Sequence, residues 1–332
     1  MWFKKLTGFA EESPDQVRKN IKINGQSLQS LVNGQSYYFG KLEISSLAEL
    51  RKKAPSVTGF NNKISVSEVV GDVQLFHVFP ENENALFQAA SQFNLLEMVS
   101  PRVTPEDGIG RYQYDKTQGP ACAIACGAGT IYRNYFAEIN DKIGQTADNQ
   151  IDCLAAIGKE LNNDELNLWQ MKNGYALATK DGLEYISKYL KSLNQEAYEN
   201  LKSKLKIGIQ WNTEVTLSET KHRVSQIYCS ALPVSYSQNN ADEWDAFARL
   251  ILEATYEATL YAALINYKKT GNNKLFLTLV GGGAFGNKSS WILDAIKKAI
   301  TLFKNTPLDV KFVSYGGSDP VVKNLIVSLD KY

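Results

Sequence analysis

Four glycines within the six residues 281–286 constrain this chain more than any other feature of its sequence. The residues before them, 275–280, are almost wholly apolar, which is typical of a strand buried on both faces. After them, from Ser290, apolar residues recur at helical spacing. The sequence therefore predicts a strand, a glycine loop and a helix in direct succession.

The glycine loop predicts a phosphate site. Without Cβ atoms its backbone N–H groups are open to a ligand, and the positive end of the following helix points at the same place. A tight turn is the alternative, but a turn needs one glycine, whereas four indicate that something approaches the backbone closely. We expect ligand contacts from Gly281, Gly282, Gly283, Ala284, Phe285, Gly286 and Asn287.

Two common phosphate motifs fit this loop only in part. A P-loop requires lysine directly after its last glycine, but Asn287 stands there and Lys288 comes one residue late. The dinucleotide fingerprint G-x-G-x-x-G matches Gly281, Gly283 and Gly286. That motif belongs near the start of a Rossmann unit, whereas this loop lies near the end of the chain. Neither motif identifies the ligand.

Composition excludes several classes of protein. The 332 residues suffice for one large or two modest domains, and a net charge of +1 gives no electrostatic reason to expect nucleic acid or a membrane as partner. No run of about 18 apolar residues and no signal peptide are found, so we expect a cytoplasmic chain, with secretion by a specialised system left open. Four cysteines without paired spacing and two histidines predict no metal, and no cofactor is expected.

Strand and helix patterns alternate from residue 60 onward, which predicts an α/β sheet with helices on both faces. Residues 1–58 carry Asn-Gly turns at 24–25 and 33–34, so hairpins are expected over 17–27 and 31–44, followed by a helix at 46–53. We interpret this part as a β-rich N-terminal extension. Further strands are expected at 206–213 and 224–236. Residues 140–205 are interpreted as an insertion with a hairpin at Asn173-Gly174.

Two motifs in residues 63–98 resemble the opening of a macrodomain. They are a strand ending in Gly71-Asp72 and an apolar strand ending in Ala89-Ala90, with Asn94 shortly after. The glycine loop resembles the Gly-Ala-Phe-Gly-Asn loop of glycohydrolase-type macrodomains, the family of the poly(ADP-ribose) glycohydrolases. The resemblance covers about 60–135 and 205–318. It implies a three-layer α/β/α mixed sheet over residues 60–332 that binds ADP-ribose.

The resemblance also implies where each part of ADP-ribose binds. Asp72, with Val73 beside it, would accept a hydrogen bond from adenine, and Tyr315 would pack on the ligand. Gln92 and Asn94 would lie near the distal ribose. The diphosphate would lie between the glycine loop and the helix that begins at Gln118 and Gly119.

The long loop 101–118 carries the candidate catalytic carboxylates. It resembles the first ligand loop of microbial poly(ADP-ribose) glycohydrolases, but where they have Gln-Glu-Glu this chain has Gln118-Gly119-Pro120. Because breaking a glycosidic bond needs a carboxyl group or an oriented water, we assign the chemistry to Asp107 and Asp115, with Glu106 in reserve. In its aspartates this loop resembles the corresponding loop of macrodomain effectors of intracellular bacteria. Solvent-facing carboxylates are the alternative.

The predicted function is binding of ADP-ribose and its hydrolytic removal from a modified protein, with ubiquitin as one candidate partner. Two alternatives stay open. One is a reader module that binds ADP-ribose without chemistry, and the other is a nucleotide-binding α/β protein that uses the glycine loop for a different phosphate.

Overall fold

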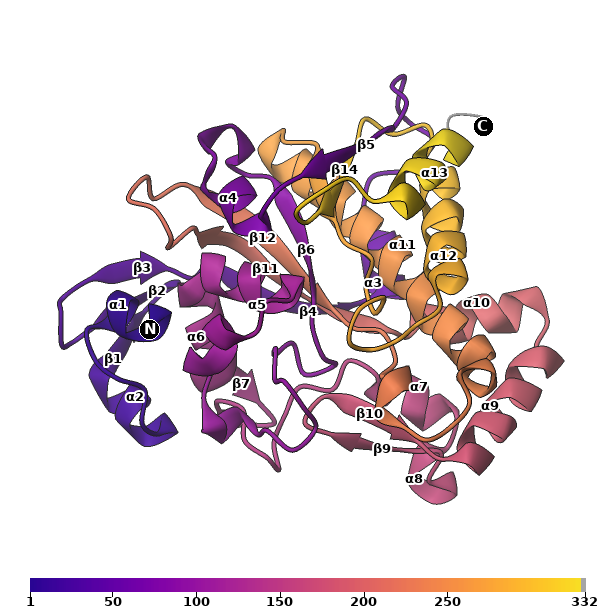
Figure 1. The fold of residues 1–332 in the computed structure, drawn as a ribbon, viewed down its shortest axis with the longest axis horizontal. Helices are drawn as coiled ribbons and strands as arrows, with labels where there is room; N and C mark the ends of the chain where they lie inside the picture. The colour runs from indigo at the N-terminus through magenta and orange to yellow at the C-terminus, as the bar shows by residue number, and fades with distance from the viewer. Residues whose placement is uncertain (330–332) are drawn as a thin grey trace.

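A seven-stranded mixed sheet forms the centre of the molecule in a computed structural model that describes residues 1–329 (Figure 1). Its strand order is β4-β11-β12-β6-β13-β14-β5. The four pairings from β12 to β5 are parallel, and β4, β11 and β12 pair antiparallel. The strands are β4 (Lys41–Ser46), β11 (Lys206–Glu214), β12 (Arg223–Cys229), β6 (Leu86–Ala90), β13 (Lys274–Leu277), β14 (Asp309–Ser314) and β5 (Ser65–Val70).

The side chains of β6 alternate between the two faces of the sheet, and each face is covered by helices. Phe87 stacks on His77 of α4 with ring centroids 3.7 Å apart. The next residue, Gln88, points to the other face, where its Nε2 donates to Thr259 Oγ1 of α11 at 3.0 Å. Successive side chains of a strand point to opposite faces, so a strand covered on both sides is apolar throughout apart from hydrogen-bonded groups.

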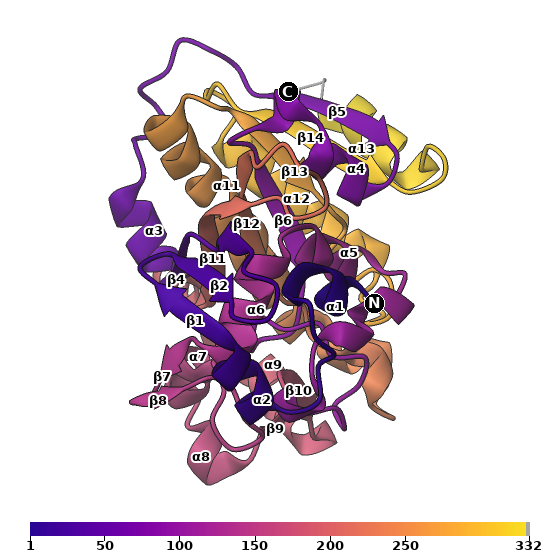
Figure 2. The same ribbon diagram turned by 90° about the vertical axis from the view of Figure 1, so that its left-hand side faces the viewer.

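The helices confirm the predicted three-layer α/β/α architecture (Figure 2). One face carries α4 (Val73–Val78), α5 (Gln118–Ala125) and α6 (Gly127–Tyr135). The other carries α3 (Leu47–Lys53) and α11 (Asp245–Thr270), with α12 (Ser289–Leu302) packed on α11 and α13 (Pro320–Leu329) beside it. Among residues 1–329 no helix has the length and apolarity needed to cross a bilayer.

Some predicted boundaries differ from the observed ones. The helix expected from residue 119 divides at Cys126, because Gly127 N–H donates to Thr216 Oγ1 at 2.9 Å instead of continuing α5. The strand expected over 224–236 ends at Cys229, and Pro233, which has no N–H to donate to a ladder, precedes a 3₁₀ turn. A second 3₁₀ turn, with a capping box formed by Asn240 and Glu243, leads into α11.

The N-terminal segment turns at both predicted Asn-Gly pairs, but its hairpins span 21–30 and 27–38 rather than 17–27 and 31–44, and no strand begins at residue 17. Ser13 accepts from Gln16 N–H and Pro14 occupies the first helical position, so residues 14–20 form a helix. The sheet also extends past the expected boundary at residue 58, because β4 pairs with β11. The elements are α1 (Trp2–Thr7), α2 (Pro14–Asn20), β1 (Ile21–Asn24), β2 (Ser27–Ser30) and β3 (Ser36–Tyr38).

Residues 140–205 contribute no strand to the seven-stranded sheet in the part of the chain that the structure describes. The predicted hairpin at Asn173-Gly174 is confirmed. The elements at and within this segment are β7 (Glu138–Ile139), β8 (Lys142–Ile143), α7 (Ala155–Glu160), α8 (Asn163–Leu166), β9 (Trp169–Lys172), β10 (Tyr175–Ala178), α9 (Lys180–Ser192) and α10 (Gln195–Ser203).

A network of ion pairs joins three helices from distant parts of the chain. Arg51 of α3 lies 2.7 Å from Glu257 of α11 and 2.8 Å from Glu199 of α10. Lys202 of α10 lies 3.0 Å from Glu257, and both of these side chains are buried. Buried charges are tolerated only when they are paired, so each member depends on the others.

We expect Glu257→Gln to lower the free energy of unfolding by about 3 kcal/mol, near the low end for a broken buried pair because Glu199 remains. Denaturant unfolding measures the change. Glu196→Gln, at an exposed position of α10, is the control and should change stability by less than about 0.5 kcal/mol. Equal effects of the two variants would contradict a structural role for the network.

Candidate functional site

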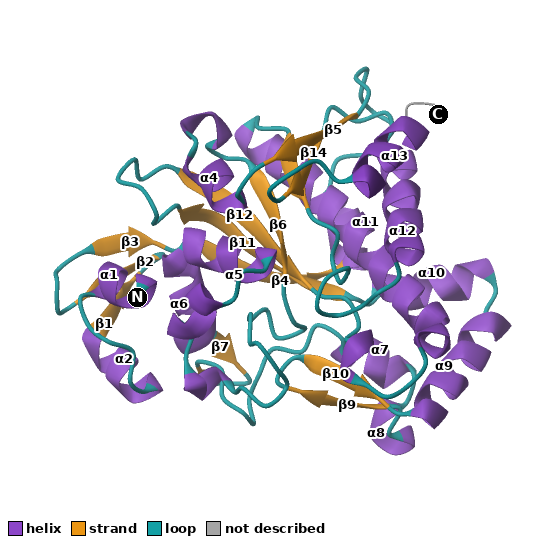
Figure 3. Cartoon of the chain, in the orientation of Figure 1, coloured by secondary structure: helices purple, strands orange, loops and turns teal. Residues whose placement is uncertain are grey.

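A cavity of about 330 Å³ lies at the carboxyl edge of the parallel strands. Its walls come from the loops after β6, β12 and β13 and from the start of α5, and Figure 3 shows the long loops after β6 and β13 at this end of the sheet. Ligands of open α/β sheets bind at this edge. A more open cleft of about 700 Å³ lies between α10, α11 and α12, but each charged side chain that lines it is already ion-paired. The smaller cavity is therefore the candidate site.

The glycine loop forms one wall with its backbone N–H groups. Gly281 and Gly286 have φ of +79° and +69°, which favour glycine, and Asn287 N–H closes the turn on Gly281 O at 2.9 Å. The N–H groups of four residues find no acceptor within residues 1–329: Gly281, Gly283, Ala284 and Phe285. All four of these residues line the cavity, so the wall is rich in unused donors.

The start of α5 forms the opposite wall. The side chain of Gln118 ties it to β6, since Nε2 donates to Gln88 O at 2.7 Å and Oε1 accepts from Ala90 N–H at 3.1 Å. The preceding Thr117 makes no capping bond to the helix. Within residues 1–329 the N–H groups of Gln118 and Gly119 find no acceptor. The cavity therefore lies between two sets of free donors, the arrangement that binds an anion.

Glu97 is a buried carboxyl in this cavity that the sequence analysis did not select. Its side chain lines the cavity, the residue is 3% exposed, and Oε1 has no hydrogen-bond partner in the described chain. Burial raises the pKa of Glu97 well above its usual range, the charge of Arg133 opposes this shift, and Asp115 adds to it. Burial therefore favours the protonated form of this carboxyl, which can donate a hydrogen bond.

Two tyrosines fix the backbone at Glu97. Glu97 N–H donates to Tyr112 Oη at 2.8 Å, and Tyr175 Oη donates to the carbonyl of Met98 at 2.5 Å. The only sequence signal for this site is one glutamate inside the apolar run 93–99, since charged residues are rarely buried without a role.

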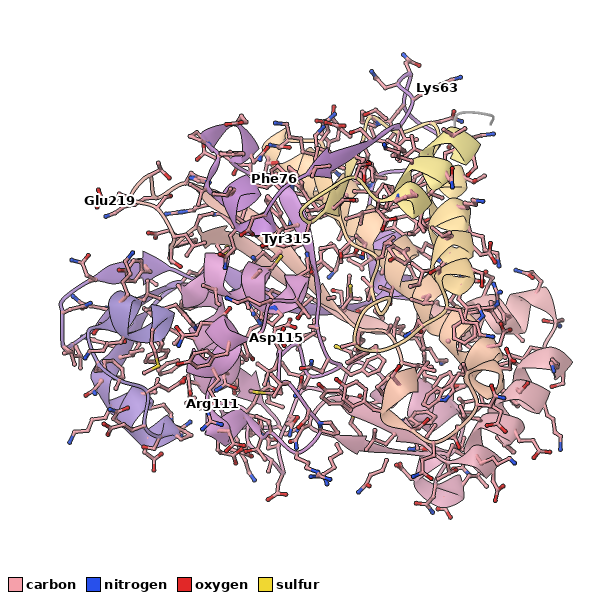
Figure 4. All side chains as sticks on the ribbon, viewed as in Figure 1. Lys63, Phe76, Arg111, Asp115, Glu219 and Tyr315 are labelled. Atoms are coloured by element: carbon pink, nitrogen blue, oxygen red, sulfur yellow. The ribbon has the colours of Figure 1, made fainter. Side chains whose placement is uncertain are left out.

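Of the three predicted carboxylates, only Asp115 lines the cavity. Its Oδ1 accepts from Thr117 N–H at 2.8 Å and from Thr117 Oγ1 at 2.7 Å, and Figure 4 labels it on the loop with Arg111. Asp107 is exposed and accepts from Thr104 N–H at 2.8 Å in a capping box. Glu106 is exposed and accepts from Ala147 N–H at 3.0 Å. The carboxylates of Asp107 and Glu106 thus hold the loop and lie outside the cavity wall.

The predicted ligand residues divide into two groups. Seven line the cavity: Gln92, Gln118, Gly119, Gly281, Gly283, Ala284 and Phe285. Seven do not: Asp72, Val73, Asn94, Gly282, Gly286, Asn287 and Tyr315.

Three residues of the second group have evident local roles. Asp72 Oδ1 caps α4 through Gln74 N–H at 2.8 Å, Asn94 bonds to Gln150 at 2.8 Å, and Asn287 Nδ2 donates to Leu232 O at 2.8 Å. Asp72 and Tyr315 nevertheless share the carboxyl edge of the sheet, because they follow β5 and β14, which are paired and parallel.

Aromatic rings close one side of the cavity. Tyr175 lies 5.0 Å from Tyr236 and 5.3 Å from Phe285, measured between ring centroids. Tyr175 belongs to β10 of the insertion, so a segment outside the main sheet supplies part of the wall. The sequence predicted the hairpin but gave no reason to place it at the site.

No cluster of three or more His, Cys, Asp or Glu side chains in residues 1–329 is arranged to hold a metal ion. None of the residues that line the cavity is Lys or Arg, so an anion there would be bound by N–H groups.

Comparison with known proteins places the chain near one group of solved structures. No family model and no curated protein matches it. The poly(ADP-ribose) glycohydrolase of Thermomonospora curvata is similar at 11% identity and a TM-score of 0.45, over 96% of this chain and 95% of the other. The Deinococcus radiodurans enzyme in complex with ADP-ribose is similar at 11% identity and 0.43, over 87% and 94%. With TM-scores below 0.5 these likenesses carry no weight for the function, which is inferred from the cavity.

We expect Gly119→Ala to destabilise the fold and to displace Glu97. A Cβ at this position would lie 1.9 Å from Ala90 O and 2.3 Å from Glu97 Oε2, so the expected loss is about 1–3 kcal/mol in the free energy of unfolding. Gly283→Ala is the matched control, because its Cβ would meet nothing within 4 Å. Denaturant unfolding of both variants makes the comparison, and equal stabilities would refute the close approach at Gly119.

Proposed function

We propose that this chain binds ADP-ribose and hydrolyses the bond between ADP-ribose and a modified protein. The observation that carries the proposal is that two sets of residues with unused N–H donors line a cavity that also holds a buried carboxyl and a second carboxyl. The donors suit a diphosphate, and the two carboxyl groups suit glycoside hydrolysis. The macrodomain-like motifs of the sequence support the same assignment.

An extended nucleotide fits the order of the strand ends. The diphosphate would lie between the glycine loop and the start of α5, and the distal ribose would enter the cavity toward Glu97 and Asp115. Adenine would lie toward Asp72 and Tyr315. From β6 to β5 there are three strand spacings, about 14 Å in all, which suits a ligand that runs along the edge of the sheet.

The chemistry would use the two carboxyl groups in different roles. Glu97, kept protonated by burial, would give its proton to the leaving group as the C1″ bond to the modified side chain breaks. Asp115 would take a proton from the water whose oxygen forms the new bond to C1″. The products would be ADP-ribose and the restored side chain, and proton exchange with solvent would return the two carboxyls to their starting states.

Binding is tested with a matched pair of glycine variants. Gly283→Glu should weaken ADP-ribose binding at least tenfold, about 1.4 kcal/mol, because it places a negative charge at a wall of the cavity. Gly282→Glu places the same charge at the preceding residue, which is also exposed but does not line the cavity, and it should weaken binding less. Isothermal titration calorimetry measures both. Equal losses of affinity in the two variants would contradict the placement of the diphosphate beside Gly283. Absence of ADP-ribose binding by the wild type would contradict the proposed function.

Catalysis is tested with Glu97→Gln and Asp115→Asn. Each should slow release of ADP-ribose from a modified protein by about 10²–10⁴-fold while binding changes less than tenfold. Because its pKa is raised, Glu97 keeps its proton to a higher pH than an ordinary glutamate and loses it as pH rises through that pKa, so the wild-type rate should fall over this range and the Glu97→Gln rate should not.

Asp107→Asn decides between the loop aspartates. Because Asp107 lies outside the cavity wall, this variant should keep most of the wild-type rate of ADP-ribose release. A large loss of rate in Asp107→Asn would instead assign the catalytic role to Asp107. ADP-ribosylated ubiquitin and a mixture of ADP-ribosylated proteins serve as substrates. Binding without release by wild type on every substrate would instead support a reader module.

A further inference from the structure

Glu11 bonds to the loop that carries Asp115 from 98 residues away. Its Oε1 accepts from Ile109 N–H at 3.0 Å and from Tyr135 Oη at 2.5 Å. Its Oε2 accepts from Gly110 N–H at 2.6 Å. One carboxylate therefore satisfies three donors, two of which are consecutive backbone groups of loop 101–118.

The loop is shaped to admit this carboxylate. A Cβ on Gly108 would lie 2.6 Å from Glu11 Oε2, and a Cβ on Gly110 would lie 2.7 Å from it, so both glycines make room for the contact. Gly108 also has φ of +86°, which favours glycine. Ile109 and Gly110 are buried, so removal of the carboxylate would leave their N–H groups without this acceptor.

Packing of the N-terminal segment places Glu11. Phe3 and Leu6 of α1 are buried, and Phe3 packs edge to face on Phe9 with ring centroids 5.5 Å apart. Trp2 N–H donates to Gln113 Oε1 at 3.3 Å, which is a further bond to the same loop. The segment before Glu11 is thus held by a core contact and by a bond to the loop itself.

We propose that Glu11 is a positioning residue that holds loop 101–118 in the conformation in which Asp115 lines the cavity. Asp115 follows Gly110 by five residues, through the 3₁₀ turn Gly110–Tyr114, so the two anchored N–H groups set where that turn begins. The role in turnover rests on the proposed function, whereas the role in holding the loop does not.

The first experiment is hydrogen exchange of the full chain in the wild type and in Glu11→Ala, Glu11→Gln and Glu12→Ala. In Glu11→Ala the amides of Ile109 and Gly110 should exchange at least tenfold faster. Glu11→Gln keeps the shape of the side chain and one carbonyl acceptor, so its exchange rates at these amides should lie between those of the wild type and Glu11→Ala. It replaces the alanine variant in the comparison if that variant does not fold. Glu12→Ala, at the neighbouring exposed glutamate, should match the wild type. Exchange in both Glu11 variants equal to that of Glu12→Ala would overturn the proposal.

The second experiment separates positioning from general stability. Glu11→Ala should lower kcat at least tenfold while its Kd for ADP-ribose changes less than threefold, and added acetate should restore part of kcat by refilling the carboxylate site. Equal losses in affinity and turnover with no rescue would overturn a positioning role. If the wild type releases no ADP-ribose from any substrate, the proposed function fails, and hydrogen exchange still decides whether Glu11 holds the loop.

Discussion

The side chain of Gln118 is the contact on which the candidate site depends. Its amide bonds to two backbone groups of β6, so the first turn of α5 is held against the end of the central strand. Because this tie uses only the side chain of Gln118, it leaves the first N–H groups of α5 unused. Gly119 then lets the helix approach Ala90 O and Glu97 closely. The same contact therefore builds the donor wall and places it next to the buried carboxyl.

The charge balance of the cavity follows from that geometry. With no Lys or Arg in its lining, the cavity offers an anion neutral donors such as the backbone N–H groups, which need little reorganisation when a ligand arrives. Two carboxyl groups in the same space would repel a diphosphate if both were ionised. Burial of Glu97 avoids this, because it favours the protonated form. One environment thus admits an anion and supplies a proton donor.

Segments outside the main sheet complete the site. The insertion supplies Tyr175, whose hydroxyl group bonds to Met98 O and whose ring contacts Tyr236 and Phe285. The N-terminal segment supplies Glu11, which bonds to the loop carrying Asp115. All of these contacts join residues more than 60 positions apart, so the cavity is a product of the whole chain.

The sequence by itself determined the elements whose cause is local. Glycine spacing located the loop after β13, Asn-Gly pairs located the hairpins, and alternating strand and helix patterns established the layered α/β class. It placed Gly119 at the site because glycine and proline mark the start of α5, and it offered Asp115 as one of three loop carboxylates. Only the tertiary structure showed that Asp107 caps its own loop, that Glu97 is buried at the cavity, and that β4 joins the sheet. The physical reason is that burial, pairing and a raised pKa depend on neighbours distant in sequence, whereas turn and helix signals depend on residues a few positions away.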